Sequence, residues 1–172
     1  ETNTRVITSG EKQLDMMNID EEIPTLKNTV SKERSATRVR MLPSMLEVLE
    51  NNKHNAYPQA FFETGEVTLL DDSPEGASNK MKAAYIETGK ESSFTDAREI
   101  LQVLERDLGI EFGIIQEDKP FLKQNRAGKI QFKNEEIGFI GEISEQILEN
   151  WQLEKPATAF ELNLEKLEEL KQ

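Results

Sequence analysis

Two pairs of strand-forming segments, each joined by a short polar turn, constrain this chain most. The first pair is Ala60 to Leu70 and Met81 to Thr88, separated by the turn-forming run Asp-Asp-Ser-Pro-Glu-Gly. The second pair is Ala127 to Lys133 and Glu136 to Ile143, joined through Lys-Asn-Glu. Segments rich in β-branched and aromatic residues that are joined so closely pair antiparallel. The sequence therefore predicts a mainly antiparallel sheet, with a bulge or bend at Gly65.

Two longer helices are predicted, one before the first pair of strands and one between the two pairs. From about Leu42 to Lys53, apolar residues recur at helical spacing, and Pro43 falls in the first turn, where a helix tolerates proline. The clearest amphipathic helix begins after a cap at Ser92 or Ser93 and ends at Gly109.

Further strands are predicted at Thr25 to Val30, Ile110 to Ile115 and Ala157 to Leu164, and the polar run Gln116 to Arg126 is predicted to be a loop. A short helix capped by Ser144 precedes the last strand, and a charged helix follows it. Strands joined by hairpins, with helices between the groups, indicate an α+β fold in which a mainly antiparallel sheet is flanked by helices.

Length and charge limit the function. The 172 residues fit a single domain, 1–172, with one core. Because the chain begins with Glu1 and not Met, we expect it to be a piece of a longer protein. The net charge of −12 disfavours a free-standing nucleic-acid module, since phosphate contacts need clustered Lys and Arg. The sequence contains no run of about 18 apolar residues, so it predicts no membrane-spanning helix.

The usual signatures of catalytic and metal sites are missing from the sequence. Cysteine is absent, which excludes disulfides, thiolate zinc sites and cysteine nucleophiles. The single histidine, His54, has no second histidine with which to share a metal, and no GxSxG elbow supplies a serine nucleophile. Phosphate-binding glycine loops and HExxH are also absent. We therefore predict no catalytic and no metal-binding residue.

One local concentration of basic charge stands out, and it consists of Arg34, Arg38 and Arg40. On an acidic chain, guanidinium groups find carboxylates, either on a partner or within the same domain. We predict ionic contacts for these three residues; direct contact with nucleic acid is a weaker alternative.

Four motifs stand in the order and at the spacing of a known family. They are the run 35–67, which includes Arg-Met-Leu-Pro and Phe-Glu-Thr-Gly-Glu-Val, then Asn-Arg-Ala-Gly at 125–128, Gly-Phe-Ile-Gly-Glu-Ile at 138–143 and Ala-Phe-Glu-Leu-Asn-Leu at 159–164. Over residues 5–167 the chain thus resembles the β chain of phenylalanyl-tRNA synthetase, of archaeal and eukaryotic type. The resemblance implies a degenerate class II synthetase core, the catalytic-like domain near the C-terminus of that chain.

The resemblance also implies a role: a non-catalytic structural domain that packs on the α subunit, in a cytoplasmic heterotetramer that attaches phenylalanine to tRNA(Phe). In this family ATP and phenylalanine bind the α chain, so ATP and magnesium serve the whole enzyme and no cofactor is expected here. Adenylation needs arginines on the phosphates of ATP, and the strand region 60–70 contains none. The fragment alone is therefore predicted to be inactive. The alternative is a free-standing regulatory or amino-acid-binding domain with the same fold.

The resemblance places the helix from Leu42 to Lys53 against the α subunit. Its apolar residues run nearly around the helix, whereas a surface helix needs a stripe only about 100° wide. This breadth indicates two contacts, one with the sheet of this domain and one with another chain. The alternative is a fully buried core helix. The predicted subunit-interface residues are Met41, Leu42, Met45, Leu46, Val48 and Leu49.

Overall fold

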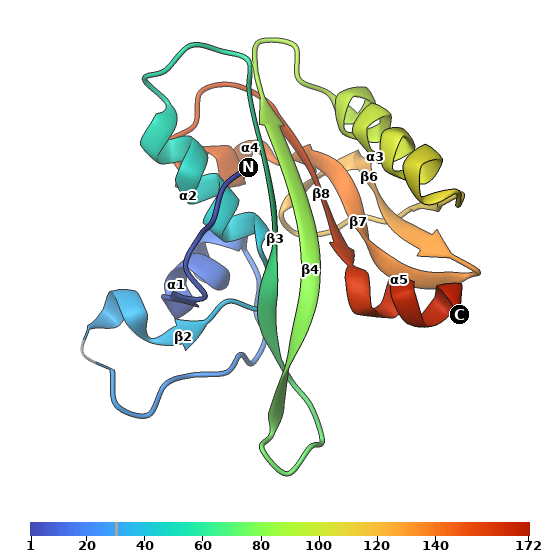
Figure 1. Cartoon of the computed structure of the whole chain (residues 1–172). Coiled ribbons are helices and arrows are strands. Elements are labelled where there is room, and N and C mark those ends of the chain that lie inside the picture. The colour runs from blue at the N-terminus through green and yellow to red at the C-terminus, as the bar shows by residue number, and fades with distance from the viewer. Residues whose placement is uncertain (30) are drawn as a thin grey trace.

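The computed structural model describes residues 1–29 and 31–172, and its centre is an antiparallel sheet (Figure 1). The strands of this sheet are β3 (Gln59–Leu70), β4 (Ala77–Thr88), β5 (Gly113–Gln116), β6 (Leu122–Phe132), β7 (Glu135–Ile143) and β8 (Ala157–Asn163). Their order is β3-β4-β8-β7-β6-β5, and every pairing is antiparallel. The predicted sheet type is therefore confirmed.

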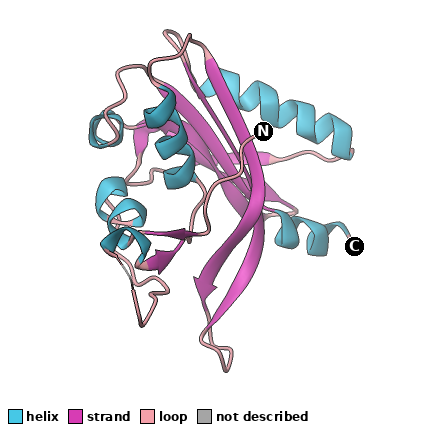
Figure 2. Cartoon of the chain, turned by 60° about the vertical axis from the view of Figure 1, so that its left-hand side comes forward, coloured by secondary structure: helices cyan, strands magenta, loops and turns pink. Residues whose placement is uncertain are grey.

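Helices cover both faces of the sheet. The α-helices are α1 (Gly10–Gln13), α2 (Leu42–Asn52), α3 (Phe94–Leu108), α4 (Glu145–Asn150) and α5 (Leu164–Lys171), and the short 3-10 helices are η1 (Asp15–Met17) and η2 (Lys32–Arg34). Figures 1 and 2 show α1, α2 and α4 on one face, and α3 and α5 on the other. A two-stranded sheet of β1 (Ile7–Thr8) and β2 (Ala36–Thr37) lies beside α1. The α+β class follows from these layers.

Local turn and cap signals account for the elements that were predicted correctly. The β6–β7 loop contains Lys133 and Asn134, both with positive φ, as a tight hairpin turn requires. Ser93 forms a capping box with Asp96 at the start of α3, and Gly109 ends that helix in the left-handed conformation. These signals act within a few residues, so the sequence reveals them directly.

Two predictions about the positions of strands need correction. Strand β6 begins at Leu122, inside the run predicted to be a loop, and its pairing with β7 is interrupted between Leu122 and Ala127. The polar, exposed residues of this irregular segment hide the strand pattern. Asn125, with φ 60°, lies at the irregularity, in a left-handed conformation that asparagine tolerates better than most residues. The strand predicted from Thr25 is only an isolated bridge to Ala36, and Val30 lies outside the described residues.

Of the bulge or bend predicted at Gly65, the bulge is wrong. Strand β3 pairs with β4 without a register shift, and Gly65 lies opposite Lys82. A Cβ atom at this position would collide with the guanidinium group of Arg38. Glycine is needed here because a buried arginine crosses the strand, and the backbone itself stays regular.

Candidate functional site

A pocket of about 620 Å³ lies over the α2 face of the central strands, and we call it the sheet pocket. Phe121, Phe139 and Leu69 contribute apolar surface to it. Its charged lining residues are Asp20, Glu21, Arg40, Lys82, Lys119, Glu136, Glu161 and Lys166. Apolar surface with charges of both signs is the kind of concave surface that binds small molecules, so the state of each charge decides what the pocket can do.

Arg40 is held by a carboxylate from the N-terminal segment. Its Nη1 and Nη2 atoms donate to Oε1 and Oε2 of Glu21 at 2.6 and 2.8 Å. The hydrogen bond from Arg40 is the main cause of the lowered pKa of Glu21. A two-pronged pair of this kind occupies the fork that would otherwise grip a carboxylate or phosphate.

Lys82 is held in the same way by Glu161, which comes from the central strand β8. The Lys82 Nζ to Glu161 Oε1 distance is 2.7 Å, and the Glu161 side chain is only 2% exposed. The other oxygen of Glu161 accepts the backbone N–H groups of Met41 and Leu42 at 3.0 and 3.2 Å. A carboxylate at the N-terminus of a helix satisfies donors that have no partner within the helix. Glu161 therefore fastens α2 to the sheet.

The remaining cations of the sheet pocket are also paired. Lys119 lies 2.8 Å from Glu117 and 3.7 Å from Glu136, and Lys166 lies 3.1 Å from Glu135. Within residues 1–29 and 31–172, every Lys or Arg that lines the sheet pocket thus has a carboxylate of this chain beside it. The pocket offers a polyphosphate no cation that is free of such a pair.

Arg38 lies far from solvent, in an ion pair with Glu63 of β3. Both side chains are 2% exposed, and their closest N–O distance is 2.7 Å. Arg38 also donates to Thr4 Oγ1 and to the carbonyl of Glu66, each at 2.7 Å. The sequence left open whether these arginines contact carboxylates or nucleic acid. Arg38 and Arg40 both form ion pairs with carboxylates of this domain.

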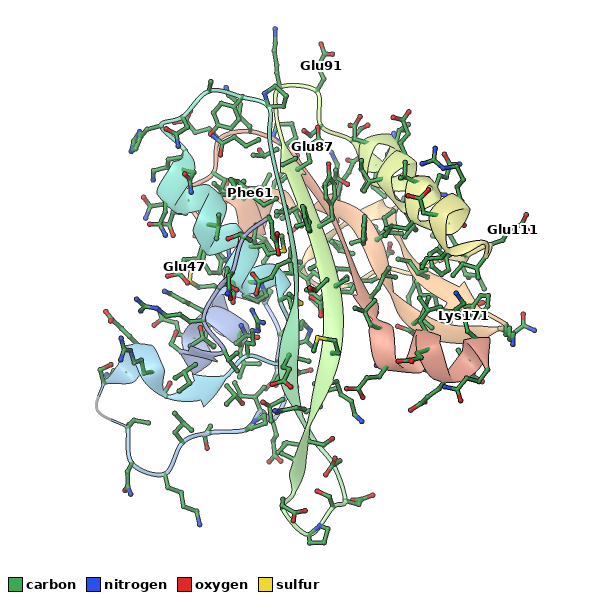
Figure 3. All side chains as sticks on the ribbon, in the orientation of Figure 1. Glu47, Phe61, Glu87, Glu91, Glu111 and Lys171 are labelled. Atoms are coloured by element: carbon green, nitrogen blue, oxygen red, sulfur yellow. The ribbon has the colours of Figure 1, made fainter. Side chains whose placement is uncertain are left out.

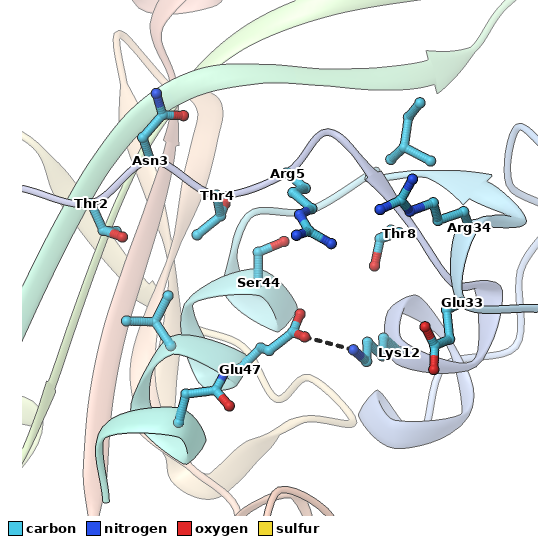
Figure 4. Close-up of a pocket in the computed structure, with 13 residues that line it drawn as sticks. Thr2, Asn3, Thr4, Arg5, Thr8, Lys12, Glu33, Arg34, Ser44 and Glu47 are labelled. Carbon is cyan, nitrogen blue, oxygen red and sulfur yellow. Dashed lines mark hydrogen bonds and ion pairs between the residues drawn. The ribbon is translucent and has the colours of Figure 1, made fainter.

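Arg34 lies apart from these two, on η2, at the edge of a second pocket of about 370 Å³ (Figure 4). We call it the N-terminal pocket, because the segment Thr2–Thr8 forms much of its lining. Its other polar lining residues include Lys12, Glu33, Arg34, Ser44 and Glu47. The spacing of the three arginines in the sequence did not indicate that they serve three different sites.

The subunit interface predicted on α2 requires correction. Five of its six residues, Met41, Leu42, Met45, Leu46 and Leu49, are at most 1% exposed. One side of α2 packs on the sheet, and the segment around Met17 helps cover the rest, in one core cluster with Trp151. Both apolar sides of the helix are thus covered by this chain, which is the core-helix alternative. Val48 alone is partly exposed, and its role stays a prediction.

The carboxylates that matter most were missed at the sequence level. The sequence indicates Glu161 only as part of a strand, and it carries no signal that Glu63 and Glu21 are paired. A glutamate inside the apolar strand 157–164 was the one visible sign, because a buried carboxylate needs partners. Its partners lie about 80 and 120 positions away, so sequence spacing did not reveal them.

In the described part of the chain no group of His, Asp and Glu is placed to hold a metal ion. Among the same residues, no helix is both long and apolar enough to cross a membrane.

Comparison with known proteins identifies the family. Residues 1–164 match the family described as "Phenylalanyl tRNA synthetase beta chain CLM domain". The phenylalanine–tRNA ligase β subunits of Pyrococcus abyssi and Pyrococcus furiosus are each 44% identical, over 94% and 97% of this chain. That of Saccharolobus solfataricus is 32% identical over 84% of the chain. The chain spans 29%, 30% and 27% of these relatives. The chain belongs to the phenylalanyl-tRNA synthetase β chain family and corresponds to its CLM domain.

Proposed function

We propose that this chain is a non-catalytic structural domain of a phenylalanine–tRNA ligase β subunit that packs on the α subunit. The main support for the non-catalytic role is the sheet pocket, whose cations are neutralised by carboxylates of the same chain. Arg40 pairs with Glu21, and Lys82 pairs with Glu161. We further propose that the six-stranded sheet of this domain is a degenerate class II synthetase core. The domain would lie near the end of the β subunit, in a cytoplasmic heterotetramer. The names of the relatives do not favour the alternative of a free-standing regulatory domain.

The residues of the sheet pocket do not fit ATP with magnesium. The transition state of adenylation builds negative charge on phosphates, and a catalyst meets that charge with unpaired guanidinium groups. Here the fork of Arg40 already holds a carboxylate, and Lys82 faces Glu161 at 2.7 Å. We therefore assign ATP, magnesium and phenylalanine to the α subunit, and derive no chemical step in this domain.

The chain alone is expected to show no phenylalanine-dependent exchange of pyrophosphate into ATP, because its cations are paired. Exchange is measured with the 172-residue chain, with buffer, and with the complete α and β enzyme as positive control. Exchange by the chain above the buffer value, lost in Arg40→Gln, would contradict the non-catalytic assignment.

We also assign tRNA(Phe) binding to other parts of the enzyme. The chain carries a net charge of −12, and its surface shows this: Glu91 and Glu111 extend outward near the two ends of α3 (Figure 3). A field of this sign opposes phosphate at long range. On this proposal the domain is linked to tRNA(Phe) only through the other parts of the assembled α and β enzyme.

The surface that best suits a subunit contact lies on β3 and β4. Phe62 and Leu70 are 51% and 48% exposed, and Met81 is 37% exposed. The register places all three on one face, because Phe62 lies opposite Tyr85, Glu66 opposite Met81 and Leu70 opposite Ala77. Tyr85 packs with α3, whereas Phe62 remains half exposed beside it. Exposed aromatic and Met side chains on a chain this acidic favour a protein partner.

Association with the α subunit is expected to weaken at least about tenfold in Phe62→Glu, since a charge would replace a buried apolar contact. Val48→Glu tests the side of α2 that remains open. Ile115→Glu is the matched control, because Ile115 is 48% exposed on β5, at the opposite edge of the sheet. Affinities are measured by titration with purified α subunit. An unchanged affinity in both Phe62→Glu and Val48→Glu would contradict these surfaces.

A further inference from the structure

The N-terminal pocket carries cations in a different state from those of the sheet pocket. Arg5 and Arg34 line it, and in the described part of the chain neither has a carboxylate at ion-pair distance. Lys12, the third cation, lies 2.7 Å from Glu47. Figure 4 shows Arg5 and Arg34 on one side of the pocket and the Lys12–Glu47 pair on the other. Both arginine side chains are exposed, so their guanidinium groups are free to meet a ligand in this pocket.

Two hydroxyl groups in the same pocket also lack partners. Ser44 and Thr8 are only 6% and 8% exposed. Among the described residues, neither side chain makes a hydrogen bond, although both line the pocket. The hydroxyl groups of both point into the space between Arg5, Arg34 and Lys12 (Figure 4). Neither hydroxyl oxygen is among the buried side-chain atoms of the described residues that lack a partner, so both oxygens open onto the pocket. There each can donate to a ligand, because a hydroxyl group is both donor and acceptor.

The donors are held in place by the fold. Arg5 lies between Thr4, whose N–H and hydroxyl donate to Glu63, and Val6, whose carbonyl accepts the Arg38 N–H at 2.8 Å. Ser35, next to Arg34, donates its N–H to the Thr8 carbonyl at 3.0 Å. These bonds fix the backbone on both sides of the pocket. A ligand would therefore meet a preformed backbone, and only the side chains of the pocket would have to be ordered on binding.

We infer that the N-terminal pocket is a binding site for a phosphate group, as the free ion or as a phosphate monoester. One guanidinium fork suffices for a planar carboxylate. Here two guanidiniums and two hydroxyls arrive from separate segments (Thr2–Thr8, η2 and α2), which suits the several outward oxygens of a tetrahedral anion, whereas Lys12 is neutralised by Glu47. Arg is also the side chain best suited to phosphate by charge and geometry. This site is independent of the subunit role proposed above.

The test is thermal unfolding of the 172-residue chain titrated with inorganic phosphate or with AMP, at constant ionic strength set with KCl. A ligand that binds only the folded state raises the unfolding midpoint in a saturable way. We expect saturation in the unmodified chain. Arg34→Gln and, separately, Arg5→Gln should require about tenfold more phosphate, because each removes charge-assisted hydrogen bonds.

Arg106→Gln is the matched control: it removes the same charge from α3, where Arg106 contacts Asp107 on an exposed surface away from the pocket. It should leave the phosphate response within about twofold of the unmodified chain, since distant surface charges are screened. A response to both phosphate and AMP supports a monoester site, and a response to phosphate alone supports a free-ion site. No saturable response to either ligand, or equal losses in Arg106→Gln and both pocket variants, overturns the inference.

Discussion

Replacing Met45 by glutamate is expected to abolish the folded state. Met45 is fully buried in the core cluster that joins α2 to the sheet, together with Leu49, Val67 and Trp151. Loss of a buried methionine typically costs about 2–5 kcal/mol, and an unpaired buried carboxylate adds a further penalty. Domains are stable by only about 5–15 kcal/mol. Far-UV circular dichroism and the loss of a cooperative thermal transition measure the effect.

Val48→Glu is the control for this experiment, because it places the same charge on the same helix three residues away. Val48 is partly exposed, so its new carboxylate can reach water and the domain should remain folded. If Met45→Glu retains a cooperative transition near that of the unmodified chain, α2 is not the core helix described here. Unfolding of both variants would place the open side of α2 in the core as well.

The second large effect is expected at the buried ion pair. Arg38→Met should lower the free energy of unfolding by about 3–5 kcal/mol, because it leaves the carboxylate of Glu63 buried without a cation. It also removes the donors to Thr4 and to the Glu66 carbonyl, so the N-terminal segment loses an anchor. Urea unfolding gives the free energy directly.

The double variant Arg38→Met with Glu63→Met separates the charge from the contacts. With no charge left buried, it should be more stable than Arg38→Met alone, since removing both partners avoids the uncompensated ion. Arg40→Met is the comparison at a partly exposed pair, where the loss should be about 1 kcal/mol or less. Equal losses in Arg38→Met and Arg40→Met would show that burial does not set the energy of the Arg38 pair.

The sequence predicts well those elements whose signals are local. Three such signals are the turn after β3, the helix cap at Ser93 and the helix end at Gly109. Each depends on residues only a few positions apart, and all three lie where they were predicted. The same holds for the helix that Ser144 caps, where its side chain accepts the N–H of Ile147. Propensity and capping act over such distances and need no knowledge of tertiary contacts.

The predictions that failed depend on distant partners. The broad apolar surface of α2 suggested a second chain, but the second cover comes from Met17 and its neighbours, in a stretch whose polar composition gave no sign of a core role. The three arginines looked like one patch because only their spacing was visible. In the structure Arg38 pairs with Glu63, and Arg40 pairs with Glu21. Arg34 lines the N-terminal pocket. These surroundings are formed by residues that are distant in the sequence.

The position of β8 bears on the order in which the chain folds during synthesis. β8 lies between β4 and β7, yet it is the last strand of the sheet to leave the ribosome. Until then, β3–β4 and β5–β6–β7 have no strand to join them, and the N-terminus of α2 lacks the carboxylate of Glu161. Pairings so distant along the chain form slowly and leave strand edges open in the meantime. The nascent domain therefore exposes two separate sheet edges until its final strand arrives and closes both at once.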